Sequence, residues 1–172
     1  MTLVKNGLDS LSPTELARCS FQSDAEGNEL IYVCKDCDFL KEIEYLKSKV
    51  DAGADLIITQ MFFDCKVFDS FVTCCRNAGI NVPIIPGIMC LSSYGGFQRM
   101  TSICKTRVTK ELTEEIEKVK NNDDEFKVFG VNLGIKMCNS LINSKVPGLH
   151  FYTLNSSVST LEIINSIGLS RM

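Results

Sequence analysis

The stretch Lys47-Ser-Lys-Val-Asp-Ala-Gly-Ala-Asp-Leu-Ile-Ile-Thr-Gln-Met-Phe-Phe-Asp64 decides the fold, because it joins the end of a helix to a buried strand. A helix over residues 38–52 is predicted because apolar side chains recur there at spacings of three and four. Gly53 follows as a stop signal. Residues 55–63 form a nearly continuous apolar run, which is typical of a parallel strand with both faces covered.

The alternation of strands and helices continues on both sides of this stretch. Before it, Leu30–Val33 is a candidate strand. After it we expect a helix capped by Asp64, a strand over 82–88, one or two helices within 92–121, a long helix starting after Asn122, a strand over 149–154 and a closing helix over 157–167. This order predicts an α/β protein with parallel strands. It fits either about the last four β/α units of a (β/α)8 barrel or a small open sheet.

Residues 1–28 differ from the rest and are expected to be a weakly ordered lead-in. Ser12-Pro-Thr-Glu15 has the pattern of a capping box for a short helix, but residues 20–28 are polar and show no period. Residues 29–172 are then expected to form one domain, since 172 residues suffice for a single buried core.

The composition excludes several classes of function. Apolar residues make up 45% of the chain and the net charge is -3, which argues against a nucleic-acid-binding surface. No apolar run is long enough to cross a bilayer, and the N-terminus lacks the apolar core of a signal peptide. A cytoplasmic protein is the simplest expectation.

Nine cysteines and a single histidine, His150, raise the question of metal or thiol chemistry. Cys34 and Cys37 have the spacing of a redox pair or of half a zinc site. A structural zinc site needs a second pair of ligands, and Cys74-Cys75 has the wrong spacing. Free, mostly structural thiols and no metal site are therefore predicted.

Ligands of parallel α/β folds bind at the carboxyl ends of the strands, which directs attention to Gln60. Its amide offers both a donor and an acceptor to the edge of a flat heteroaromatic ligand; alternatively, the neighbouring backbone satisfies it. Lys49 either interacts favourably with the negative end of the helix dipole or contacts an anionic group such as a phosphate. Tyr152 and Asn155 are either core and turn residues or parts of a pocket wall.

The segment 47–64 closely resembles a signature of methylenetetrahydrofolate reductases. Further blocks agree in order and spacing: Ala78-Gly-Ile with Pro83-Ile-Ile-Pro-Gly-Ile88, Asn122-Asp-Asp with Phe129-Gly-Val-Asn-Leu133, and Val146-Pro-Gly-Leu-His-Phe-Tyr-Thr-Leu-Asn155. The resemblance covers residues 38–169. It implies a (β/α)8 barrel that binds FAD and passes a hydride from NADPH or NADH to 5,10-methylenetetrahydrofolate, giving 5-methyltetrahydrofolate for methionine synthesis.

The resemblance also implies roles for individual residues. Gln60 would contact the folate pterin, Lys49 would contact FAD, and Glu42 stands where the family has an Asp near the flavin. Two departures concern binding: Ser156 replaces a family Arg, and the Tyr-Pro…His-Pro motif is absent from the stretch that begins at Ile31. The general-acid Glu has no counterpart in this chain, so no catalytic residue is assigned.

Two functional readings remain open. In the first, the chain is the C-terminal part of a reductase barrel whose first half lies outside it, with a reduced folate and NAD(P)H as partners. In the second, it is a truncated, non-catalytic remnant that cannot bind flavin by itself. The sequence does not distinguish NADPH from NADH, and association into a homo-oligomer is left open.

Overall fold

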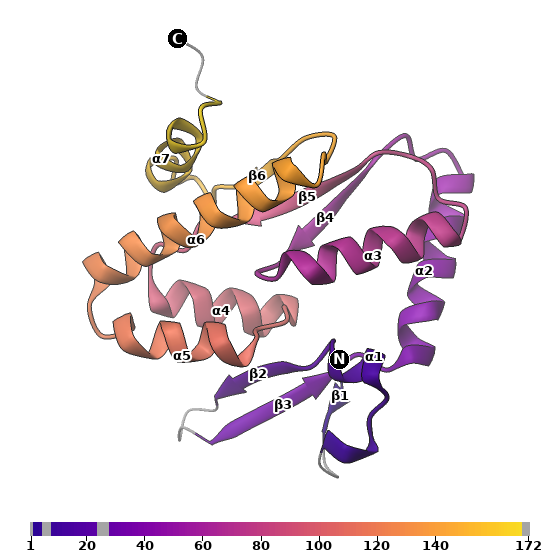
Figure 1. The fold of residues 1–172 in the computed structure, drawn as a ribbon, viewed down its shortest axis with the longest axis horizontal. Coiled ribbons are helices and arrows are strands. Elements are labelled where there is room, and N and C mark those ends of the chain that lie inside the picture. Colours follow the sequence, from indigo (N-terminus) through magenta and orange to yellow (C-terminus); the bar gives the residue numbers. More distant parts are fainter. Residues whose placement is uncertain (1, 5–7, 24–27, 170–172) are drawn as a thin grey trace.

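The computed structural model describes residues 2–4, 8–23 and 28–169 (Figure 1). The N-terminal elements are β1 (Thr2–Leu3), a 3-10 helix η1 (Leu8–Ser10), α1 (Pro13–Leu16), β2 (Ser20–Ser23) and β3 (Glu29–Val33). The remaining elements are α2 (Asp36–Asp51), β4 (Ile57–Met61), α3 (Cys65–Asn77), β5 (Ile84–Met89), α4 (Tyr94–Cys104), α5 (Lys110–Val119), α6 (Asp123–Asn143), β6 (His150–Tyr152) and α7 (Val158–Ser166).

A parallel sheet with strand order β4-β5-β6 organises the larger part of the chain. Ile57 pairs with Ile84, and Ile88 pairs with Phe151, so these side chains share one face. That face packs on side chains from α2, α3, α6 and α7, among them Ile43, Phe68, Cys138 and Ile163. The expected mixed α/β fold with parallel strands is confirmed for this part of the chain.

The helices begin and end where local chemistry predicts. Asp64 caps α3 by accepting a hydrogen bond from the backbone N of Lys66. Asn122 caps α6 in the same way, through the backbone N of Asp124 and of Glu125. Gly79, which ends α3, has φ +80°, a backbone conformation that glycine adopts without strain. The predicted stretch 92–121 forms two helices, α4 and α5.

β3 forms where a strand was predicted, but it does not join the parallel sheet. It pairs antiparallel with β1 on one side and with β2 on the other. In a parallel β/α unit the chain returns after the helix to a strand beside the first one, so β3 would lie beside β4. Because β3 pairs with β1 and β2 instead, the prediction of four consecutive parallel strands was wrong. The physical reason is local: β2 precedes β3 closely in the sequence and offers it four paired positions.

β4 is not covered on both faces, contrary to the expectation from its apolar sequence. Ile57 packs into the core, but Ile58 is 44% exposed, and Leu56 just before the strand is 46% exposed. The described helices contribute to the core on only one face of the sheet. The apolar sequence of β4 is therefore typical of a strand packed on both faces, but the described residues pack on only one of them.

The lead-in of residues 1–28 is more structured than expected where it is described. The predicted capping box is confirmed: the Ser12 side chain accepts from the Glu15 backbone N, and the Glu15 carboxylate accepts from the Ser12 backbone N. Cys19 and Ser20 are fully buried. The strand β2 was not predicted, and residues 1, 5–7 and 24–27 lie outside the described residues. A domain boundary at residue 28 stays a prediction.

A second core lies between α4, α5 and α6. It joins Phe97, Leu112, Ile116 and Phe126 to Phe63, which follows β4. This core attaches the α4–α5 pair to the parallel sheet at the end where β4 and β5 finish. None of the helices in the described ranges is long and apolar enough to span a membrane.

Candidate functional site

The carboxyl ends of β4, β5 and β6 meet at one end of the parallel sheet, the usual place for ligands in this class of fold (Figure 1). A cavity of about 150 Å³ lies there, between the ends of β5 and β6 and the start of α4. Its lining includes Cys90, Ser93, Gly96, Phe97 and Tyr152. We call it the strand-end cavity.

Tyr152 reaches across the middle strand of the sheet. Its hydroxyl donates a hydrogen bond to the carbonyl oxygen of Thr59 on β4, at 3.0 Å. The Thr59 hydroxyl oxygen accepts one from the backbone N of Gly87, also at 3.0 Å. A Cβ at position 87 would lie 2.2 Å from the Thr59 carbonyl oxygen and 2.7 Å from Cε2 of Tyr152, so this close approach requires glycine.

Gln60, the predicted pterin contact, is exposed near the carboxyl end of β4. Its Oε1 accepts a hydrogen bond from the backbone N of Met61 at 3.1 Å. The amide nitrogen donates no hydrogen bond to any part of the chain that the structure describes. The neighbouring backbone thus satisfies half of this amide, and the NH2 group stays available to a ligand.

Lys49 and Glu42, the predicted FAD contacts, lie on α2. They are seven positions apart (49 − 42), close to two helical turns, so they share one exposed side of the helix. Tyr45 lies between them on that side, and the Lys49 Nζ is 4.1 Å from the centre of its ring. Sequence reasoning missed Tyr45, although its spacing of three and four from Glu42 and Lys49 was readable.

The structure does not bring Lys49 and Gln60 together. Lys49 lies in the last turn of α2, which leads to the start of β4, whereas Gln60 lies near the opposite end of that strand (Figure 1). A ligand that touched both would have to extend along the sheet. Lys49 and Gln60 therefore belong to two separate exposed polar regions of the surface rather than to one cluster.

The thiols near the strand ends behave as core groups. Burial raises the pKa of Cys90, whose Sγ lies 3.2 Å from the Thr160 hydroxyl oxygen. Burial also raises the pKa of Cys138 to about 12, which keeps this thiol protonated at neutral pH. Among the described residues, no group of three or more His, Cys, Asp or Glu side chains is arranged to hold a metal ion.

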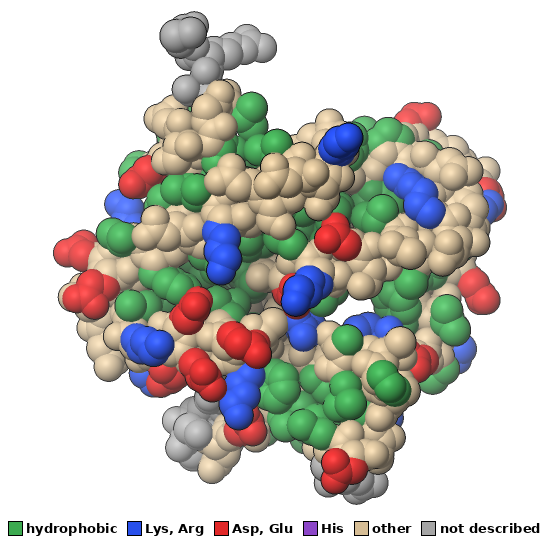
Figure 2. Space-filling model, in the orientation of Figure 1, with side chains coloured by type: hydrophobic (Ala, Val, Ile, Leu, Met, Phe, Trp, Pro, Cys, Tyr) green, Lys and Arg blue, Asp and Glu red, His purple; other side chains and the backbone are tan. Residues whose placement is uncertain are grey.

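A larger cavity of about 280 Å³ lies away from the strand ends, between α1, α2 and α3. Figure 2 shows this face hollowed between α3 and the N-terminal elements, with basic side chains beside the hollow. Arg18 and Arg107 line the cavity, but they form ion pairs with Asp36 and Asp64, respectively. Both guanidinium groups are therefore engaged in ion pairs within the fold.

Comparison with known proteins identifies a family that matches most of the chain. The family model described as methylenetetrahydrofolate reductase matches residues 31–168. A rice (Oryza sativa subsp. japonica) protein named "Probable methylenetetrahydrofolate reductase (NADH)" is 47% identical over 131 residues, which cover 76% of this chain and 22% of that protein. A Caenorhabditis elegans protein named "Probable methylenetetrahydrofolate reductase (NADPH)" is 38% identical over 132 residues, covering 76% and 20%.

The similarity extends to bacteria. The "5,10-methylenetetrahydrofolate reductase" of Salmonella typhimurium is 35% identical over 123 residues, covering 72% of this chain and 42% of that protein. The chain spans only about a fifth of the length of the rice and nematode relatives. The matched range of residues 31–168 nevertheless spans the whole parallel sheet. The chain belongs to the methylenetetrahydrofolate reductase family.

Proposed function

We propose that this chain supplies the C-terminal part of a (β/α)8 barrel that reduces 5,10-methylenetetrahydrofolate to 5-methyltetrahydrofolate with NAD(P)H and FAD. The observation that carries the proposal is Gln60, an exposed strand-end amide whose NH2 group has no partner in the described chain. The exposed Ile58 and Leu56 beside it are consistent with a sheet face that further strands and ligands would cover.

Gln60 would bind the folate through its amide edge. A pterin presents alternating donors and acceptors in one plane, and a side-chain amide offers one of each. If the bound pterin covered this amide without pairing with it, the unpaired group would cost about 1–3 kcal/mol. A ring orientation that pairs donors with acceptors is therefore favoured. The nicotinamide carboxamide has the same donor and acceptor types, so one glutamine serves both ligands.

Lys49 and Glu42 would hold the FAD from α2. The Lys49 ammonium is an exposed cation suited to a pyrophosphate, and Glu42 on the same side of the helix accepts hydrogen bonds from sugar hydroxyls. Tyr45 between them offers an aromatic surface. The bound flavin would supply the hydride acceptor and donor, while these side chains bind and orient it.

The acid of the reaction would come from outside this chain. The described strands β4, β5 and β6 carry no carboxylate, and the first one after the carboxyl end of β4, Asp64, caps α3 and pairs with Arg107. We therefore infer that this chain binds and orients ligands, and that protonation depends on strands of the first half of the barrel.

A second candidate, a non-catalytic remnant, is favoured by the sheet edges. In the described chain, β4 and β6 each have a single partner, β5, so each leaves one edge unpaired. Unpaired edges promote association rather than a closed active site. In this case the chain alone would bind no flavin.

Complementation separates the two candidates. The chain would be produced alone and together with the N-terminal half of the rice relative's barrel, and flavin absorbance would be measured after purification. We expect a colourless chain alone and a yellow complex with the added half, with flavin retention reduced by Lys49→Ala. Gln60→Ala should keep the flavin and lose folate-dependent oxidation of the reduced enzyme. A colourless complex would refute the proposed function and favour the remnant.

A further inference from the structure

β2, which precedes the family-matched segment, is attached to the connection between α4 and α5. The backbone N of Phe21 donates to the carbonyl oxygen of Val108 at 2.8 Å. The Ser20 hydroxyl accepts from the backbone N of Val108 at 2.9 Å and donates to the carbonyl oxygen of Thr106 at 3.3 Å. Ser20 is fully buried, so these bonds are shielded from water.

The contact continues through α4 toward the strand-end cavity. The backbone N of Thr106 donates to the carbonyl oxygen of Thr101 at 3.2 Å. The Thr101 hydroxyl in turn donates to the carbonyl oxygen of Phe97 at 2.9 Å. Phe97 lines the strand-end cavity together with Tyr152. An unbroken series of bonds and peptide units therefore joins Ser20 to the cavity wall.

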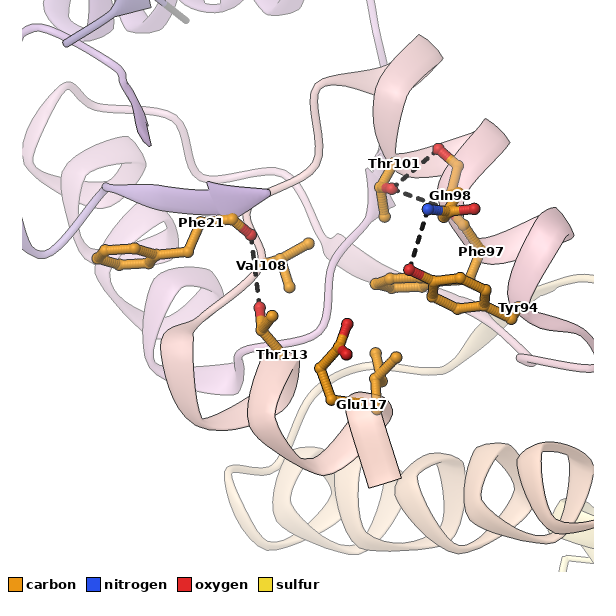
Figure 3. A pocket seen from close by; sticks show the side chains of 9 residues that line it. Phe21, Tyr94, Phe97, Gln98, Thr101, Val108, Thr113 and Glu117 are labelled. Carbon is orange, nitrogen blue, oxygen red and sulfur yellow. Dashed lines mark hydrogen bonds between the residues drawn. The ribbon is translucent and has the colours of Figure 1, made fainter. Parts of the chain in front are cut away.

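A second, smaller cavity, of about 60 Å³, is also lined by Phe97 (Figure 3). Phe21, Thr101 and Val108 also line it, and the Thr113 hydroxyl donates to the Phe21 carbonyl oxygen at 3.5 Å. Phe97 is thus shared by two cavities, one facing β2 and one facing the strand ends. Movement of α4 would change both together.

We propose that Ser20 and Phe21 are positioning residues for the strand-end cavity, acting through the α4–α5 connection and Phe97. They hold α4 so that its first turn forms one wall of the cavity. The effect on folate binding rests on the proposed function. The effect on the shape of the cavity does not, because Cys90 lines the cavity and is only half-buried, so its rate of alkylation depends on how open this end of the sheet is.

The test compares Ser20→Ala with the unaltered chain by alkylation with iodoacetamide, read out for each cysteine by peptide mass spectrometry. We expect Cys90 to react about tenfold faster in the variant, because a buried N–H of Val108 loses its acceptor and α4 opens more often. Cys75 and Cys138, both fully buried, report global unfolding and should stay unreactive. Ser70→Ala, which removes an exposed hydroxyl from α3, is the matched control.

Two outcomes overturn the proposal. One is a folded Ser20→Ala chain with unchanged Cys90 reactivity. The other is a parallel rise at Cys90, Cys75 and Cys138, which would make Ser20 a general stabiliser. If Ser20→Ala does not fold, Phe21→Leu keeps the apolar contact, reduces the packing against the α4–α5 pair, and faces the same criteria. Normal cavity behaviour without any flavin or folate binding would refute only the proposed function.

Discussion

The hydroxyl of Tyr152 on β6 donates a hydrogen bond to the carbonyl oxygen of Thr59 on β4, two strands away. Between Ile58 and Met61 the register of β4 against β5 shifts, and Thr59 lies within this irregular stretch. The tyrosine therefore ties the outer strands together where the regular pairing is interrupted, next to Gln60 and the strand-end cavity.

Replacing Tyr152 by Phe should remove this hydrogen bond and leave the packing of the ring largely unchanged. A net hydrogen bond of this kind stabilises a protein by about 1 kcal/mol, so the free energy of unfolding should fall by roughly that amount. Urea unfolding followed by circular dichroism measures it. Tyr45→Phe is the control, because Tyr45 is 59% exposed and its hydroxyl makes no hydrogen bond within the described chain. Equal losses in both variants would contradict the role of the bond.

Gly87→Ala should be more damaging than its size suggests. The added Cβ would lie 2.2 Å from a backbone oxygen, which cannot move without displacing β4. Overpacking of this kind costs about 1–3 kcal/mol or more. The same substitution at Gly95 in the first turn of α4 meets no atom within 4 Å and should be neutral or slightly stabilising. Thermal unfolding of the two variants would compare them, and similar melting temperatures would be the contrary result.

The ion pair between Arg107 and Asp64 should contribute more than a surface pair, because both side chains are mostly buried (17% and 21% exposed). A double-mutant cycle with Arg107→Gln and Asp64→Asn measures the coupling, and Asn preserves an acceptor for the cap of α3. We expect a coupling of about 1–3 kcal/mol.

The matched control for this cycle is the Lys47–Asp51 pair on α2, where one carboxylate is 59% exposed. Exposed pairs at this helical spacing contribute about 0.3–0.5 kcal/mol. A coupling for Arg107 and Asp64 no larger than for the control pair would show that burial adds nothing here.

The junction between α1 and α2 should weaken in acid. The Arg18 guanidinium and the hydroxyls of Ser12 and Thr14 hold the pKa of Asp36 below its usual value, and hydrogen bonds from the backbone N–H groups of Asp36 and Ser12 lower the pKa of Glu15. A carboxylate with a lowered pKa in the folded state stabilises that state above the pKa of the unfolded chain, about 4. This contribution is lost as the pH falls through the folded pKa.

Hydrogen exchange of α1 and of the first turn of α2 between pH 6 and pH 3 would measure this weakening, after correction for intrinsic exchange rates. Asp36→Asn should already show weakened protection at neutral pH and a smaller pH dependence. An unchanged pH dependence in this variant would place the acid sensitivity elsewhere.

Periodicity and caps predicted most of the parallel part of the fold. The residues that decide it, such as Asp64, Gly79 and Asn122, act on their own neighbours, so local sequence suffices. The position of Gln60 at a strand end followed from the same logic. The sequence left open whether the neighbouring backbone satisfies its amide, because the contact with Met61 depends on the rotamer of one side chain.

Non-local contacts explain what the sequence did not reveal. β2 is a short polar strand whose buried residue Ser20 forms hydrogen bonds with residues 86 and 88 positions later. The exposed face of β4 escaped prediction for a related reason, since an apolar run shows that a strand can be buried but not what covers it. The antiparallel pairing of β3 depended on recognising β2 first.

The 88-residue separation between Ser20 and Val108 also sets the order of events at the ribosome. Translation proceeds at about 5–20 residues per second, so β2 is synthesised roughly 4–18 seconds before Val108 is. During that interval β2 can pair with β3, but the hydrogen bonds from Ser20 and Phe21 to Val108 cannot yet form. The attachment of β2 to the α4–α5 connection is therefore a late step of folding during synthesis, after pairing with β3 has become possible.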